Sequence, residues 1–459
     1  MPSSGKDFIP WPATRSGLGR ASPLRYRLER RQPLLEVLVL RTRARGHLLH
    51  SLELLTRHEI LALEESLDQR PDLLVQFGLE TTEGTHGAGR GTGEIVEQTV
   101  PRLHDGRTIA TGTPCCKRAT AAPIRLAMSG IIVVTGGAGF IGSNILAGLD
   151  ARGGDALVCC DLFGDGDKWK NVAKRSLFDM VAPARLADWL AGPEGARVTA
   201  IVHMGAISDT TARDVDRVLD QNFAFTRMLW SWCSAHQVRF IYASSAATYG
   251  DGAMGFDDDS SLSGLARLRP MNPYGWSKHL FDRFAAQALA TGQARPPQHV
   301  GLKFFNVYGP NEYHKGGQRS VVHQIHPIAA RGEPFALFKS HRAGVGDGQQ
   351  LRDFVWVGDC VDVVLWLLDT PRVSGLFNIG SGKARSFLDL ATAVYAACGR
   401  NANIVFRDMP TELREHYQYF TEAKLERLRA AGFVRPFTTI ETGVERYVRD
   451  YLAAGEAFA

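Results

Sequence analysis

The sequence of 459 residues has no hydrophobic run near the roughly 20 residues that a membrane-spanning helix needs. The longest run near its start, residues 34–40, is flanked by arginines and is too short for a secretory signal. Cysteine is scarce, and the adjacent pairs Cys115–Cys116 and Cys159–Cys160 suit neither a disulfide framework nor a C-x-x-C metal site. We therefore expect a cytoplasmic protein with reduced thiols, no membrane segment and no bound metal.

An excess of charge is also missing from most of the chain. Residues 1–127 contain 16 Arg, 2 Lys and 14 acidic residues, which gives +4 of the net charge of +5. The remaining residues carry 35 basic and 34 acidic side chains, which gives +1. A near-neutral main body has no basic surface for a phosphate backbone, so nucleic-acid binding is not expected.

The first 127 residues lack a regular pattern and a catalytic constellation. Residues 84–93 are typical of a flexible linker, and residues 47–69 are compatible with one amphipathic helix. Three interpretations stay open: a disordered or partly helical extension, a transit peptide, or an artefact of start-site choice. We favour the third, because Met128 stands three residues before the first strand of a complete fold.

From Ile131 onward, short apolar strands alternate with helices. The patterns predict strands at residues 131–135, 156–160, 200–203, 239–243 and 300–304, and helices ending near 149 and spanning 183–190, 213–236 and 274–290. Such alternation is typical of a doubly wound parallel sheet, an α/β fold of Rossmann-like type. We expect a dinucleotide-binding domain over residues 128–306 and a smaller α/β substrate-binding lobe mainly over 307–459.

A glycine-rich turn follows the first predicted strand. Gly136 and Gly139 permit a tight turn close to a pyrophosphate, and Gly142 lets the next helix pack on the strand. The N-terminus of that helix offers free N–H groups to phosphates. Asp161 follows 19 residues after Gly142, at the end of the second strand, where an acidic residue binds a ribose hydroxyl. This context predicts an NAD(P) site.

The residues leave the choice between the two nicotinamide cofactors open. Asp161 can accept hydrogen bonds from a free ribose hydroxyl, which favours NAD. Lys168 and Lys170 could neutralise a 2′-phosphate, which favours NADP.

A Tyr-x-x-x-Lys motif, Tyr274 and Lys278, supplies candidate acid–base chemistry because the two residues share one helix face. An ammonium group one turn from a phenol is expected to lower the pKa of the phenol from its reference of about 10. Such a tyrosine can take and return the proton of a sugar hydroxyl while nicotinamide takes the hydride. The preceding strand ends in Ser244 and Ser245, where a hydroxyl could hydrogen-bond the reacting oxygen.

The order of these motifs resembles the extended short-chain dehydrogenase/reductase family over residues 131–453, and within it the nucleotide-sugar epimerases and dehydratases. Among the members of that family, the sequence resembles the enzymes that epimerise C6 of an ADP-heptose. Five further segments carry this resemblance: residues 203–211 (HMGAISDTT), 244–250 (SSAATYG), 311–316 (NEYHKG), 352–355 (RDFV) and 416–421 (HYQYFT). The resemblance implies NADP, one per subunit, with NAD possible. It further implies an ADP-heptose substrate, a homo-oligomer (a homopentamer in the family) and a supply of heptose for lipopolysaccharide core or another surface polysaccharide.

The resemblance also implies roles for single residues. Tyr274 and Lys315 match two catalytic proton acceptors, with Lys278 and Ser245 as catalytic partners. Implied cofactor contacts are Gly136, Gly139, Phe140, Ile141, Gly142, Asp161, Leu162, Lys168, Met204, Gly205, Ala206, Ile207, Ser208, Asn222, Lys278, Val307 and Lys315. Implied substrate contacts are Ser244, Asn306, Gly317, Gln324, Phe338, Lys339, Ser340, His341, Arg352 and Tyr417.

Departures from the family pattern concern the details of these contacts. The family's second cofactor-contacting lysine is Pro183 here, and Lys174 or Arg175 could substitute for it. Where the family has a serine and a histidine on the substrate side, this sequence has Gly317 and Gln324. Residues 341–350 look like an insertion.

Two bases suit this reaction because C6 is exocyclic and its hydroxyl points to opposite sides before and after inversion. The alternatives are another nucleotide-sugar 4-epimerase or a 4,6-dehydratase of the same fold, or a non-catalytic NAD(P)-binding module. A dehydratase would carry an acidic residue where residues 245–248 read Ser-Ala-Ala-Thr, and a 4-epimerase would lack a base at Lys315. The intact Tyr274 and Lys278 argue against the binding module.

Overall fold

The computed structural model describes residues 130–414, 417–455 and 458–459, all within one compact unit, residues 116–459. The helix predicted over residues 47–69 and the linker predicted over 84–93 lie outside the described residues. In the described part of the chain, no helix is long and apolar enough to cross a membrane.

A seven-stranded parallel sheet in the order β10-β6-β5-β4-β1-β2-β3 forms the centre of this unit. Its strands are β1 (Ile131–Thr135), β2 (Ala156–Cys160), β3 (Asp179–Val181), β4 (Val198–His203), β5 (Arg239–Ser245), β6 (His299–Phe304) and β10 (Gly375–Ile379). The strand order reverses between β1 and β4. In open α/β sheets, ligands bind at the carboxyl ends of the strands beside such a reversal.

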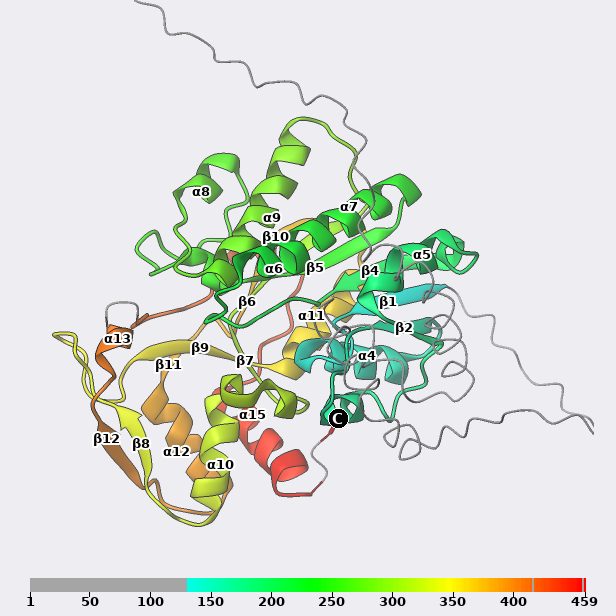
Figure 1. The fold of residues 1–459 in the computed structure, drawn as a ribbon. Coiled ribbons are helices and arrows are strands. Elements are labelled where there is room, and N and C mark those ends of the chain that lie inside the picture. The colour runs from blue at the N-terminus through cyan, green and yellow to red at the C-terminus, as the bar shows by residue number, and fades with distance from the viewer. Residues whose placement is uncertain (1–129, 415–416, 456–457) are drawn as a thin grey trace, which may run out of the picture. The chain divides into compact units, whose positions relative to one another are not determined.

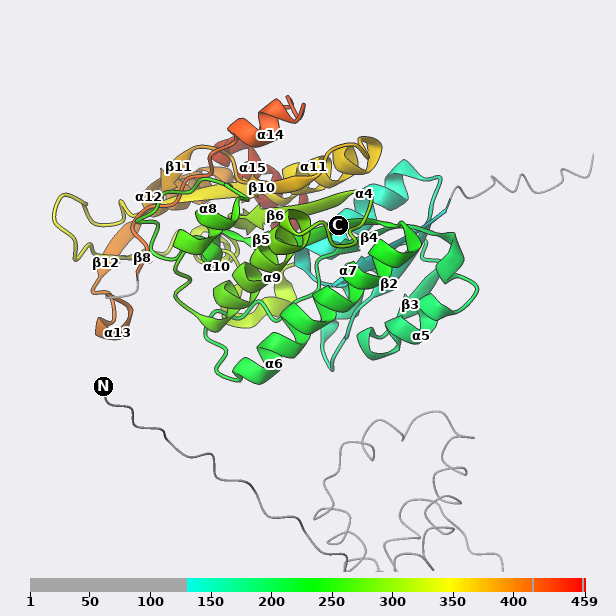
Figure 2. The same cartoon turned by 90° about the horizontal axis from the view of Figure 1, so that it is seen from above.

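Helices cover both faces of this sheet, as Figures 1 and 2 show. One face carries α6 (Val215–Leu219), α7 (Phe225–His236) and α9 (Pro273–Ala290), and the other carries α4 (Phe140–Arg152) and α11 (Val357–Asp369). All five residues of β1 are buried because successive side chains enter different cores. Ile131 and Val133 pack with Trp230, whereas Ile132 and Val134 pack with Leu146.

Two smaller sheets extend from the end of β6. They are β11-β9-β7 and β12-β8, built from β7 (Asn306–Tyr308), β8 (Phe335–Phe338), β9 (Leu351–Trp356), β11 (Ala384–Ser386) and β12 (Ile404–Arg407). The helices α10 (Val321–Ala330), α12 (Phe387–Ala397) and α15 (Ile440–Tyr447) pack against them around a separate hydrophobic core. This core includes Val322, Leu337, Phe354, Val394 and Tyr447.

The predicted doubly wound sheet is confirmed, with β1 and β2 at their predicted bounds. The helix predicted over residues 213–236 is confirmed over residues 215–236, as α6 and α7 joined without a break by a π-helical turn, Asp220–Ala224. The helix predicted over 183–190 begins as a 3-10 turn, and α5 covers Leu186–Ala191. The sequence did not predict the three-residue edge strand β3, or β10, which adds residues 375–379 to the large sheet. The domain boundary after residue 306 stays a prediction.

Candidate active site

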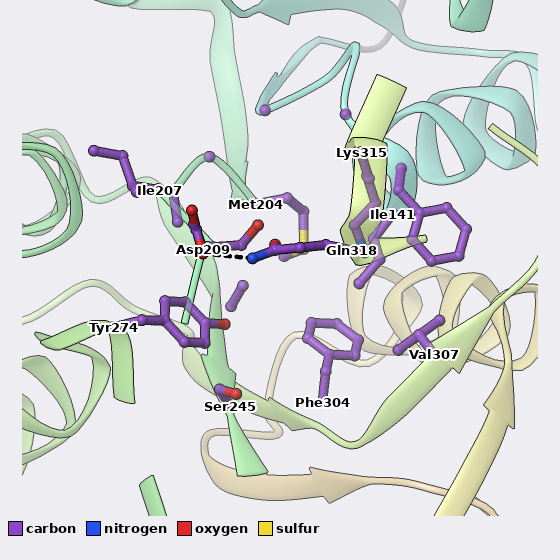
Figure 3. A pocket seen from close by; sticks show the side chains of 18 of the residues that line it. Ile141, Met204, Ile207, Asp209, Ser245, Tyr274, Phe304, Val307, Lys315 and Gln318 are labelled. Atoms are coloured by element: carbon purple, nitrogen blue, oxygen red, sulfur yellow. Dashed lines mark hydrogen bonds between the residues drawn. The ribbon is translucent and has the colours of Figure 1, made fainter. Parts of the chain in front are cut away.

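A cavity of about 740 Å³ lies at the carboxyl ends of the central strands (Figure 3). Many of the residues predicted from the sequence line it: Gly136, Gly139, Phe140, Ile141, Gly142, Asp161, Lys168, Met204, Gly205, Ala206, Ile207, Ser208, Ser244, Ser245, Tyr274, Lys278, Val307, Lys315 and Gly317. The fold therefore brings the glycine turn, the Tyr/Lys helix and the Lys315 segment to one space.

The glycine turn between β1 and α4 leaves the floor of the cavity free of side chains. Gly136 has a φ of +63°, and a Cβ there would meet the backbone N of Gly205 at 2.5 Å. A Cβ on Gly142 would lie 2.1 Å from the carbonyl oxygen of Gly136. α4 then begins without a side-chain cap, so its first N–H groups remain available to an anion. This backbone cradle fits the pyrophosphate of a dinucleotide.

Asp161 and Lys168 form a salt bridge at the cavity wall, with 2.7 Å between Oδ1 and Nζ. The Asp161 carboxylate also accepts the backbone N–H groups of Ala138 at 2.9 Å and of Leu162 at 2.7 Å. From the sequence, Asp161 favours NAD and Lys168 favours NADP. In the structure the two side chains form an ion pair, so Lys168 lies beside the carboxylate that would bind the ribose.

The residues considered as substitutes for the lysine missing at Pro183 are engaged elsewhere. Lys174 Nζ donates to the carbonyl oxygen of Phe458 at 2.7 Å, and Arg175 lies 3.5 Å from Asp150. Neither contributes to the described lining of the cavity. The expectation that they take over that contact is not supported.

Asn222 is not part of the described cavity lining, but it holds a loop that is. Its Oδ1 accepts the Ile207 N–H at 2.8 Å, and its Nδ2 donates to the Ile207 carbonyl at 2.9 Å and to Ser277 Oγ at 3.0 Å. It lies in the π-helical turn between α6 and α7. One buried amide thus ties the loop after β4 to the helix that carries Tyr274.

Tyr274 is the second residue of α9, whose first turn is capped by the Asn272 side chain accepting the Gly275 N–H at 2.8 Å. Burial raises the pKa of Tyr274, and a hydrogen bond with Ser245 offsets part of that rise. Burial lowers the pKa of Lys278 to about 8, against the opposing effect of the Asp282 carboxylate. The net pKa of Tyr274 therefore lies above its usual value and not below it, as the sequence predicted, because desolvation dominates at both residues.

Lys315 enters the same cavity from η6 (Tyr313–Gln318), a short 3-10 segment after β7. Its Nζ lies 5.3 Å from the centre of the Phe140 ring, a cation–π contact. Burial lowers the pKa of Lys315, and the carboxylate of Glu312 opposes that effect. In the view of Figure 3, Tyr274 and Lys315 lie on opposite sides of a hydrogen bond between Gln318 and Asp209.

Sequence reasoning assigned no role to part of the lining: Asp209, Thr211, Ala243, Phe304, His314 and Gln318. Gln318 Nε2 donates to Asp209 Oδ1 at 2.5 Å and so joins two walls of the cavity. The position of Phe304 at the end of β6 was an available signal, because strand ends meet the ligand in this fold. No pattern in the sequence pairs Asp209 with Gln318.

The other predicted substrate residues lie outside this cavity. Phe338, Tyr417 and Gln324 line a second cavity of about 220 Å³. The guanidinium of buried Arg352 lies 5.1 Å from the ring centre of Tyr417, beside this second cavity. Four further predicted residues also lie outside the first cavity. Lys339 lies 3.5 Å from Asp408, and the Ser340 N–H donates to Asp347. His341 Nε2 accepts the Met409 N–H, and Asn306 is exposed at the start of β7.

A side-chain-free dinucleotide cradle next to a Tyr/Lys pair is the arrangement of nicotinamide-dependent enzymes that act on hydroxyl carbons. Residues 132–380 match the model of the NAD dependent epimerase/dehydratase family, and the chain belongs to that family. Within it, the chain is similar to ADP-L-glycero-D-manno-heptose-6-epimerases. It is 47% identical to the one from Nitratidesulfovibrio vulgaris over 327 residues, which cover 71% of this chain and 99% of the relative.

Solved structures agree with this grouping. The ADP-L-glycero-D-manno-heptose-6-epimerase of Helicobacter pylori matches with a TM-score of 0.57 at 26% identity, over 70% of this chain and 96% of that chain. The UDP-glucose 4-epimerase of Thermus thermophilus, in complex with NAD, matches with a TM-score of 0.56 at 26% identity, over 69% of this chain and 97% of that chain.

Proposed function

We propose that this chain is an isomerase that interconverts ADP-D-glycero-β-D-manno-heptose and ADP-L-glycero-β-D-manno-heptose by inverting C6. The observation that carries the proposal is the presence of Lys315 in the same cavity as Tyr274. The heptose epimerases among its relatives support the substrate. The product is a precursor for lipopolysaccharide core or another surface polysaccharide.

Residues around the glycine turn hold the cofactor, which we propose to be NADP, one per subunit. The first turn of α4 and the side-chain-free floor at Gly136 and Gly142 receive the pyrophosphate. Asp161 and Lys168 border the adenosine ribose, and Lys168 neutralises the 2′-phosphate. When bound, the cofactor supplies a nicotinamide ring that accepts a hydride from C6 and returns it. NAD, which the Thermus neighbour binds, uses the same cradle.

Tyr274 and Lys315 serve the two orientations of the C6 hydroxyl. Tyr274, hydrogen-bonded to Ser245, takes the proton of one epimer, and Lys278 stabilises the phenolate one helix turn away. Lys315 serves the opposite orientation, because it approaches from a different wall. Because the pKa of Lys315 is lowered, more of its amine is neutral at neutral pH, and a proton acceptor must be neutral.

We propose that the second cavity receives the nucleotide end of the substrate. The Arg352 guanidinium supplies charge for a diphosphate, and Phe338 and Tyr417 supply aromatic surface for a base. Gln324 lines this cavity where the family has a histidine. We further propose that the active form is a cytoplasmic homo-oligomer.

The fold-mates that act on C4 or dehydrate the sugar are less well supported. The turn Ala246–Tyr249 at the cavity lacks the acidic residue that a dehydratase would use. An epimerisation at C4, a ring carbon, needs no second base of the kind that Lys315 offers to an exocyclic carbon.

Isotope exchange tests the proposed reaction. We expect the protein to convert ADP-D-glycero-heptose to the L-glycero epimer in D₂O without placing deuterium at C6, because the hydrogen on C6 returns as a hydride and never meets water. Proton NMR of the product measures both changes. Deuterium at C6 would establish inversion by deprotonation instead, and an unchanged substrate in the presence of bound NADP would leave a binding module or another sugar specificity.

Cofactor choice is tested at Lys168. We expect Lys168→Ala to weaken NADP binding about tenfold or more while changing NAD binding much less, because only NADP carries the 2′-phosphate. Titration of intrinsic fluorescence with each cofactor measures the two dissociation constants. Lys170→Ala is the matched control, since Lys170 pairs with Asp167 at 3.0 Å and is absent from the described cavity lining. Equal losses for both cofactors in Lys168→Ala would remove Lys168 from this role.

A further inference from the structure

A fully buried ion pair joins the Tyr/Lys helix, α9, to strand β6. Lys303 on β6 and Asp282 on α9 approach to 2.8 Å, and the exposed fraction of each side chain is 0%. The pair takes no part in the proposed reaction and does not line the cavity as described. Burying two charges costs free energy that their attraction often fails to recover, so such a pair is poor evidence for a purely stabilising role.

Both members of this pair form hydrogen bonds with side chains from β5 and the turn that follows it. The Asp282 carboxylate accepts the hydroxyl of Ser244 at 2.7 Å and that of Tyr242 at 3.1 Å. Lys303 Nζ donates to Thr248 Oγ1 at 2.6 Å. The pair therefore joins the end of β5 to α9 through fixed, charge-assisted contacts.

The helix register places this carboxylate next to the catalytic lysine. Tyr274, Lys278 and Asp282 stand four residues apart on α9, so they follow one another along one face of the helix. Other titratable groups around Lys278 are His203 at the end of β4 and, beyond Asp282, Tyr242 and Lys303. His203 is buried with its pKa lowered well below the usual value, so it adds no positive charge at neutral pH.

We propose that Asp282 is a positioning residue for Lys278: held by Lys303 and Ser244, its carboxylate keeps Lys278 in the ammonium form that supports Tyr274 and the cofactor. Lys303 in turn holds the Asp282 carboxylate in place at 2.8 Å. The network is thus an electrostatic support for the Tyr/Lys pair, centred on an ion pair that does not line the described cavity.

The sign of the effect follows from the charges. Burial alone lowers the pKa of Lys278, and Asp282 opposes this by favouring the charged form. Without the Asp282 charge, Lys278 keeps the full effect of burial and also faces an uncompensated Lys303. The alkaline limit of every property that needs protonated Lys278 must then move to lower pH.

The test compares Asp282→Asn with the wild-type protein. We expect the alkaline limb of kcat/KM on ADP-heptose to move down by about one pH unit, and the pH above which NADP binding weakens to move with it. Tyr242→Phe is the matched control, because it removes a hydrogen bond to the same carboxylate and leaves its charge. Asp282→Glu keeps the negative charge, so its alkaline limit is expected to return most of the way to the wild-type pH.

A second variant keeps the proposal testable if Asp282→Asn does not fold, since a lone buried Lys303 is strongly destabilising. Asp282→Asn/Lys303→Met removes both charges of the pair, and we expect a smaller shift in the same direction. Folded variants whose alkaline limits stay at the wild-type pH would overturn the proposal, as would an equal shift in Tyr242→Phe.

The proposal rests on the proposed function only through the kinetic measurement, because NADP binding needs no sugar substrate. A wild-type protein that binds NADP but leaves ADP-heptose unchanged would contradict the proposed function. The pH dependence of NADP binding in the same variants would still decide the role of Asp282.

Discussion

Tyr274→Phe is expected to lower kcat by about 10²- to 10⁴-fold, the loss typical of a missing acid–base group. The substitution removes the hydroxyl at the cavity wall and leaves the ring, so the cradle at Gly136 and the cofactor affinity are expected to persist. Steady-state kinetics with ADP-heptose, together with an NADP titration of the same sample, measure the two effects separately.

The control for this substitution is Tyr308→Phe. The Tyr308 hydroxyl is buried without a hydrogen-bond partner among the described residues, so its removal is expected to leave kcat and folding near wild type. If Tyr274→Phe kept a wild-type kcat, the phenol would not be a proton acceptor in this reaction, and the Tyr/Lys motif would be structural.

Lys315→Met is expected to produce a loss of kcat of similar size, about 10²- to 10⁴-fold. Methionine retains an unbranched side chain that still packs against Phe140, so the change removes the amine rather than the contact. With one base lost, the C6 hydroxyl of one epimer has no proton acceptor on its side. Transient reduction of the cofactor in a single turnover, measured from each epimer separately, tests this, because the first hydride transfer should slow more from that epimer, whereas the complete conversion slows in both directions.

Lys424→Met is a suitable control, because this lysine pairs with Asp257 at an exposed site, away from the described cavity lining. A Lys315→Met variant with full activity from both epimers would mean that Tyr274 alone handles both orientations. The two-base mechanism would then be wrong, while the redox character of the reaction could still stand on the isotope experiment.

The fold and the cofactor end of the cavity could be predicted because their signals are local. The turn at Gly136 and Gly142 is required by backbone geometry, and the burial of β1 on both faces gives an unbroken apolar run. The helix spacing of Tyr274 and Lys278 is likewise readable from the sequence. Each of these features involves neighbours within one strand–turn–helix unit or one helix.

The rest depends on contacts between distant segments. The sequence around Asp161 and Lys168 does not show whether the two side chains form an ion pair, because only the folded loop brings them together. The sign of the Tyr274 pKa shift depended on how deeply the fold buries the phenol, which the spacing to Lys278 does not report. Asn222 lies in a π-helical turn, and its amide holds the backbone of Ile207, a contact that the helical pattern does not show.

The return of the chain through β9, α11 and β10 has a mechanical consequence for the cavity. After β6 the chain leaves the large sheet to form β7 and β8, and later β9 leads directly into α11, which packs against α4. β10 then pairs with β6 along five residues before the chain leaves again. The smaller sheets are thus attached to the large one by several chain crossings rather than by a single linker. Any movement of the smaller sheets relative to the large one must therefore bend several connecting segments together.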